Sequence, residues 1–118
     1  MDTSKRREIR ARYKQADEKA TGCIYEIRCT VNGRCWVSFD PSLHGAQSRY
    51  EFSQKIGGCP LPSMLADWKQ YGKEAFTFSV LETMDKKETQ TTREFREDLE
   101  TLEELWLEKY DASTLYSR

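Results

Sequence analysis

The sequence predicts a small α/β (α+β) domain, because strand-like and helix-like stretches alternate along its 118 residues. Two runs of β-branched and aromatic residues occupy 21–39, and residues 75–82 alternate apolar with polar side chains. Residues 64–71 and 92–110 carry apolar side chains at helical spacing instead. A chain of this length is long enough to bury one hydrophobic core and too short for two.

The Asn-Gly pair at residues 32 and 33 predicts a β-hairpin within 21–39. Both residues tolerate the positive φ angles of a type I′ turn, which connects two antiparallel strands. A turn centred there places Ile27 opposite Ser38, and directly opposed residues share one face of the sheet. Tyr25 and Trp36 are therefore expected to project from the same face.

The charge pattern limits the function classes. The formal net charge is −1, so the chain lacks the global positive excess of many nucleic-acid binders, and any such contact must use local patches. No stretch approaches the roughly 20 apolar residues that a membrane span needs. The N-terminus is charged where a signal peptide has an apolar core. We therefore expect a cytoplasmic protein.

Cysteine and histidine spacing argues against a zinc site. The cysteines form no C-x-x-C pair, and the chain has a single histidine, His44. The four thiols are interpreted as reduced packing residues rather than as a disulfide or redox site. They belong to Cys23, Cys29, Cys35 and Cys59.

The N-terminal run 3–19 predicts a basic helix, because it lacks Gly and Pro and places Ile9 and Tyr13 one turn apart. It is either a phosphate-contacting arm or a solvated helix that packs lightly through Ile9 and Tyr13. We favour the solvated helix, since Glu8 interrupts the basic run. The candidate phosphate contacts are Lys5, Arg6, Arg7, Arg10 and Arg12.

Two further helices are expected between the hairpin and the last strand. The first covers about 46–54, includes Arg49, and ends before the breaker cluster at 57–60. The second covers 64–71, where Ser63 is a candidate N-cap.

The last helix, over about 92–110, has a clear apolar stripe, and Glu103 falls on its edge. A carboxylate at the edge of a buried stripe needs a cation, a network of donors or a water-filled cleft beside it, because an unpaired buried charge is costly. Four residues at the centres of their stripes are expected to be largely buried: Trp68, Phe78, Leu99 and Trp106.

Residues 22–117 resemble the GIY-YIG nuclease superfamily. The two halves of its signature correspond to Cys-Ile-Tyr at 23–25 and Trp-Val-Ser at 36–38, with a spacing common in the family. Residues 68–82 are similar to the family's passage from a helix to the third strand. Residues 103–107 fit its E-x-x-W-[IL] pattern.

The sequence departs from the family at four positions. Trp36 replaces a tyrosine, Ser38 a glycine, Ser53 a histidine or tyrosine, and Ser117 an asparagine. Tyr50 and His44 are candidates to substitute in space for the side chain missing at position 53. Trp36 is not expected to transfer a proton, because indole is only a donor.

The resemblance implies a central three-stranded antiparallel sheet flanked by helices. The strands are expected at Gly22–Thr30, Arg34–Phe39 and Ala75–Glu82. Residues 1–20 are assigned to the N-terminal helix, and 21–118 to the nuclease-like domain.

The resemblance also implies hydrolysis of a DNA phosphodiester. Tyr25 would activate or position water, Arg49 would hold the phosphate, and Glu103 would bind one Mg²⁺ or Mn²⁺. Trp36 would occupy the position of the second tyrosine, and all four side chains are expected to line one concavity. The simpler interpretations are a surface arginine at 49, and a glutamate at 103 that is paired or hydrated.

The alternative function is a catalytically impaired module that binds DNA, RNA or a protein partner. The changes at Trp36, Ser38, Ser53 and Ser117 and the weak net charge favour it. The retained Tyr25, Arg49 and Glu103 favour the endonuclease.

Overall fold

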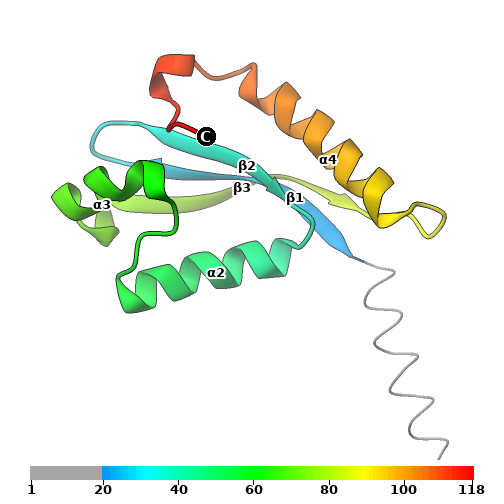
Figure 1. Ribbon diagram of the computed structural model, residues 1–118, viewed down its shortest axis with the longest axis horizontal. Helices are drawn as coiled ribbons and strands as arrows, with labels where there is room; N and C mark the ends of the chain where they lie inside the picture. Colours follow the sequence, from blue (N-terminus) through cyan, green and yellow to red (C-terminus); the bar gives the residue numbers. More distant parts are fainter. Residues whose placement is uncertain (1–19) are drawn as a thin grey trace, which may run out of the picture.

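The computed structural model describes residues 20–118, which form a three-stranded antiparallel sheet with helices on both faces (Figure 1). The strands are β1 (Thr21–Cys29), β2 (Cys35–Asp40) and β3 (Phe76–Asp85), in the order β2-β1-β3. The predicted class and sheet are confirmed. The predicted basic helix falls on residues 1–19, which lie outside the described residues.

The helices divide between the two sides of the sheet (Figure 1). Helix α2 (Leu43–Ile56) and helix α3 (Leu65–Tyr71) lie on one side, and α4 (Thr92–Leu107) lies on the other. Short 3₁₀ turns cover Pro62–Met64, Lys73–Ala75 and Ala112–Thr114. None of the helices within 20–118 is both long and apolar enough to cross a membrane.

The hairpin loop is longer than the sequence predicted. The backbone N–H of Cys29 donates to the carbonyl of Arg34 at 2.9 Å, so residues 30–33 form a four-residue loop. Gly33 supplies the loop's positive φ, at 75°, and Asn32 does not share it. The Asn32 side chain instead accepts from the N–H of Arg34 at 3.0 Å, which stabilises the wider loop. The predicted type I′ turn was therefore wrong.

The longer loop shifts the register by two residues. Tyr25 lies opposite Ser38, and Ile27 lies opposite Trp36. A shift of two keeps every side chain on its face, whereas a shift of one would move it to the other face. Tyr25 and Trp36 therefore share a face, as predicted.

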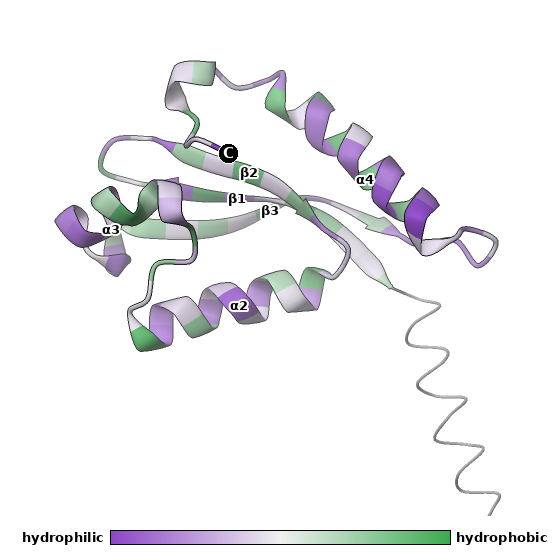
Figure 2. Ribbon diagram, viewed as in Figure 1, coloured by the Kyte–Doolittle hydropathy of each residue, from purple (hydrophilic) through white to green (hydrophobic). Residues whose placement is uncertain are grey.

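Each face of the sheet has its own core. On the side of α2 and α3, Ile27, Met64 and Trp68 are buried together. On the side of α4, Ile24 and Val37 are fully buried. Figure 2 shows the alternation of hydrophobic and hydrophilic residues along α4, which suits a helix with one buried face.

The predicted burial holds for two of four residues. Trp68 and Leu99 are buried, whereas Phe78 and Trp106 are only half-buried. Trp106 lies at the rim, because its Nε1–H donates to the carboxylate of Glu82 at 2.8 Å. The buried part of α4 begins with its first two turns, where Phe95 and Leu99 approach the backbone of β1.

The ends of the helices follow local capping. Ser42 caps α2 by accepting from the N–H of Gly45 at 3.0 Å, so this helix begins earlier than predicted. Thr91 and Glu94 form a capping box at the start of α4. Ser63 caps no helix, because a 3₁₀ turn precedes α3, and that prediction was wrong.

The outer edge of β2 is covered by groups from distant segments. The N–H of Phe39 donates to Glu103 at 2.9 Å, and the carbonyl of Cys35 accepts from the N–H of Tyr116 at 2.8 Å. Between them, Arg118 donates to the carbonyl of Val37. An edge strand with satisfied backbone groups is protected from pairing with another chain. The same contacts bring Glu103 and Arg118 to this edge.

Candidate functional site

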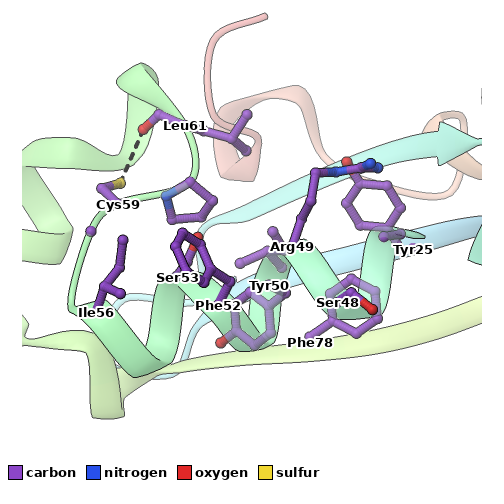
Figure 3. Close-up of a pocket in the computed structure, with 14 residues that line it drawn as sticks. Tyr25, Ser48, Arg49, Tyr50, Phe52, Ser53, Ile56, Cys59, Leu61 and Phe78 are labelled. Atoms are coloured by element: carbon purple, nitrogen blue, oxygen red, sulfur yellow. Dashed lines mark hydrogen bonds between the residues drawn. The ribbon is translucent and has the colours of Figure 1, made fainter. Parts of the chain in front are cut away.

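A pocket of about 570 Å³ lies on the face of the sheet that carries Tyr25 (Figure 3). Tyr25 lines it from β1, and Arg49 and Tyr50 line it from α2. In Figure 3, Tyr25 and Arg49 lie together at one end of this pocket. Trp36 and Glu103 are not among its lining residues.

Tyr25 is held by aromatic stacking. Its ring stacks on Phe78 with 5.4 Å between centroids, and Phe78 also stacks on Tyr50 at 5.2 Å. Such pairs fix ring positions and add to the free energy of burial. The hydroxyl of Tyr50 is a second phenol in the pocket, and it accepts a hydrogen bond from Gln54. Burial raises the pKa of Tyr50, so this phenol keeps its proton near neutral pH.

Arg49 projects from α2 at the mouth of the pocket, with 67% of its side chain exposed. Its guanidinium forms an ion pair with Asp40, the last residue of β2. Asp40 also accepts from the N–H of Ser42 at 2.8 Å, so the start of α2 holds this carboxylate in place. A guanidinium has five N–H donors, and one ion pair leaves several of them for a phosphate.

Glu103 reaches the β2 edge from α4, and its side chain is only 12% exposed. Its Oε2 accepts from the N–H of Phe39 at 2.9 Å and from the Oγ of Ser38 at 3.3 Å. Its Oε1 accepts from Nη2 of Arg118 at 2.9 Å. The predicted requirement for a donor network or a cation beside this carboxylate is thus confirmed by the presence of both.

Trp36 lies on the same face as Tyr25, under the guanidinium of Arg118, whose central carbon is 4.8 Å from the ring centroid. Its Nε1 is buried and has no hydrogen-bond partner within residues 20–118. Arg118 thereby joins Trp36 to Glu103 along the β2 edge.

The four predicted site residues thus form two pairs rather than lining one concavity. Tyr25 and Arg49 share the pocket, whereas Trp36 and Glu103 meet at Arg118. The reason is that α4 covers the opposite face, so Glu103 reaches only the edge strand.

Ser38 connects the two pairs, because it lies opposite Tyr25 in the sheet and donates to Glu103. Ser38 stands where the resembled family has a glycine, which has no side chain to make this contact. Sequence reasoning missed the roles of Ser38, Asp40 and Arg118. Arg118 follows the last helix, so no periodic pattern in the sequence indicates its contact with Glu103.

The donor set at Glu103 can be compared with the needs of a divalent ion. Mg²⁺ and Mn²⁺ prefer carboxylate oxygens, and Mg²⁺ usually keeps several waters and uses few protein ligands. Both oxygens of Glu103 have protein donors, because Oε2 accepts from Ser38 and Phe39 and Oε1 accepts from Arg118. Within residues 20–118, no group of three or more His, Cys, Asp or Glu side chains is placed to hold a metal. An ion held by this one carboxylate would therefore have to displace Arg118 from Oε1.

The fold is that of a GIY-YIG nuclease catalytic domain. Two solved structures of the catalytic domain of the intron-encoded homing endonuclease I-TevI are similar to this chain. One gives a TM-score of 0.57 with 19% identity, covering 80% of this chain and 95% of that chain. The other, of a point mutant, gives a TM-score of 0.59 with 15% identity, covering 82% of this chain and 92% of that chain.

Comparisons with protein-family models and with curated proteins find no match. The likeness therefore stands on the arrangement of sheet and helices.

Proposed function

We propose that this chain is a divalent-metal-dependent DNA endonuclease of the GIY-YIG type, which hydrolyses a phosphodiester bond. The observation that carries this proposal is the position of Ser38. It lies opposite Tyr25, whose pocket also contains Arg49, and it contacts Glu103 directly. Tyr25, Arg49 and the partly buried carboxylate of Glu103 thus all lie near strand β2.

Each of these three residues has a chemical role in the proposal. Arg49 binds the scissile phosphate through the donors that Asp40 leaves free, and it neutralises charge that develops in the transition state. Tyr25 positions and activates the attacking water through its hydroxyl. Glu103 would hold Mg²⁺ or Mn²⁺, and the ion would supply stabilisation of the charge on the leaving oxygen. Tyr50 keeps its proton and is suited to donate a hydrogen bond to the phosphate.

The alternative is a module that binds DNA, RNA or a protein without cutting. One specific observation favours it, namely that Arg118 already neutralises Glu103. Trp36, in place of a tyrosine, also removes one group able to exchange protons. The two functions differ in whether a divalent ion reaches Glu103.

The test is nicking of supercoiled plasmid with Mg²⁺, with Mn²⁺ and with excess chelator. We expect weak nicking that needs the ion and that Glu103→Gln lowers by about a hundredfold or more, because this change keeps the size of the side chain and removes its charge. Glu104→Gln is the matched control, since Glu104 is the exposed neighbour on the same helix. Nicking that persists in chelator would count against the proposal. So would the absence of nicking with either ion, and if nucleic acid still bound, the binding module would be favoured.

A further inference from the structure

The pocket continues well beyond Tyr25 and Arg49. Its other end lies between the last turns of α2 and the loop at 57–61 (Figure 3). Phe52 and Ile56 line this end and are 59% and 62% exposed, which is unusual for large apolar side chains at a cavity. Figure 2 shows the hydrophobic C-terminal end of α2.

The lining of the pocket has a consistent chemical character. Four aromatic side chains contribute to it, and Tyr25, Phe78 and Tyr50 are stacked in a row. Among the lining residues that the structure describes, Arg49, at the mouth, has the single charged side chain. A volume of about 570 Å³ falls within the range of small-ligand sites, which are typically apolar cavities with a few polar groups. The fourth aromatic side chain is Phe52.

A flat aromatic ligand that carries a phosphate matches a pocket with aromatic walls and an arginine at its mouth. Any of the nucleobases can stack on an aromatic side chain, whatever the nucleic-acid sequence, and an arginine beside the stack binds the backbone phosphate. A paired base keeps its faces within the duplex and is not free to enter such a pocket. Entry requires an unpaired or extruded base.

We propose that this pocket binds an unpaired nucleobase of the substrate, which packs against Phe52 while the adjacent phosphate lies on Arg49. The proposal rests on the proposed function and deepens it, because it names the substrate class as DNA with an unpaired nucleotide next to the cleavage site. Such DNA includes bulges, loops and single-stranded junctions. Phe52 is then a specificity-determining residue.

The test compares three labelled duplexes by fluorescence anisotropy, in chelator so that no cutting occurs. One duplex carries a single unpaired thymidine, the second an abasic site at the same bulge, and the third is fully paired. The full chain should bind the thymidine bulge about tenfold more tightly than the abasic bulge, from the stacking of one base. The paired duplex should bind no more tightly than the abasic one.

Three variants assign the preference to the pocket. Phe52→Ala should reduce the preference to less than about twofold, and Phe52→Tyr should retain it, because a phenol also stacks. Leu105→Ala is the control, since Leu105 is 52% exposed on α4 and does not line the pocket. Phe52 is largely exposed, so its truncation should leave the circular dichroism spectrum and melting temperature unchanged.

Equal binding of the three duplexes would overturn this inference, as would a preference that survives Phe52→Ala. Neither result bears on the endonuclease proposal, which rests on metal-dependent nicking of supercoiled plasmid and on Glu103. Conversely, a thymidine preference that depends on Phe52, in a protein that never nicks, would support the pocket and refute the enzyme.

Discussion

Arg118 and Glu103 form the contact on which the proposed metal site depends. A guanidinium and a divalent ion both seek Oε1 of Glu103, so they compete for one carboxylate. Arg118→Gln should therefore tighten Mn²⁺ binding, which isothermal titration calorimetry measures without any substrate. Glu103→Gln should bind no ion at this position, with or without Arg118. Unchanged Mn²⁺ affinity in Arg118→Gln would show that the ion does not use Oε1.

The largely buried carboxylate of Asp67 also contacts distant segments. Its Oδ2 accepts from Asn32 at 2.9 Å and from the hydroxyl of Tyr116 at 2.7 Å, and these bonds lower the pKa of Asp67. A carboxyl whose pKa is lower in the folded state stabilises the fold above its unfolded pKa of about 3.9. This contribution is lost as the pH falls through the folded value.

Asp67→Asn should accordingly be less stable than the wild type at pH 7, and the difference should shrink below about pH 4. Urea unfolding at a series of pH values measures this difference. A gap of constant size down to the lowest accessible pH would contradict the role of the ionised carboxyl.

At the scale of elements, the sequence predicted faces and stripes better than boundaries. The alternation in β1 and β3 and the 3.6-residue period of α4 follow from burial, which is visible in the order of side chains. The register of the hairpin was missed, because the Asn32 side chain and Gly33 together stabilise a four-residue loop that the Asn-Gly pair alone does not reveal. The cap at Ser63 was missed because a 3₁₀ turn intervenes.

The position of α4 changes which of its residues should matter most for stability. Leu99 is fully buried, so Leu99→Ala should cost about 2–5 kcal/mol of unfolding free energy. Trp106 is half-buried at the rim, so Trp106→Ala should cost less than the roughly 3–5 kcal/mol expected for a central tryptophan. Denaturant melts of the two variants provide the comparison. A larger loss for Trp106→Ala would place the core nearer the C-terminal end of α4.

At the scale of the whole molecule, the two faces of the sheet differ in how tightly they are covered. The face under α4 is closely packed, whereas the face under α2 contains the pocket. At the outer edge of β2, Glu103 from α4 bonds to the strand backbone. The sequence indicated Tyr25, Arg49 and Glu103 through the family resemblance. The sequence did not indicate that Glu103 reaches the edge of β2, because this position depends on the long-range contacts of Ser38 and Arg118.

The net charge of −1 means that the proposed DNA binding must depend on a few local cations. Arg49→Gln should weaken binding about equally for all sequences, and it should reduce the slope of log affinity against log salt by about one. Anisotropy titrations at several salt concentrations measure this slope, with Arg93→Gln as a control at an exposed arginine on α4. An unchanged slope for Arg49→Gln would remove Arg49 from the phosphate site.

In the proposed mechanism, Tyr25 and Glu103 act together in one hydrolytic site although they approach it from opposite faces of the sheet. The most direct measurement is the nicking rate of Tyr25→Phe, Glu103→Gln and the double variant with Mn²⁺. Residues of one catalytic unit are strongly non-additive. Each single change should lower the rate by about a hundredfold or more, and the double variant should be no slower than the slower single one. Losses that multiply in the double variant, or a Tyr25→Phe rate equal to that of the wild type, would contradict the account.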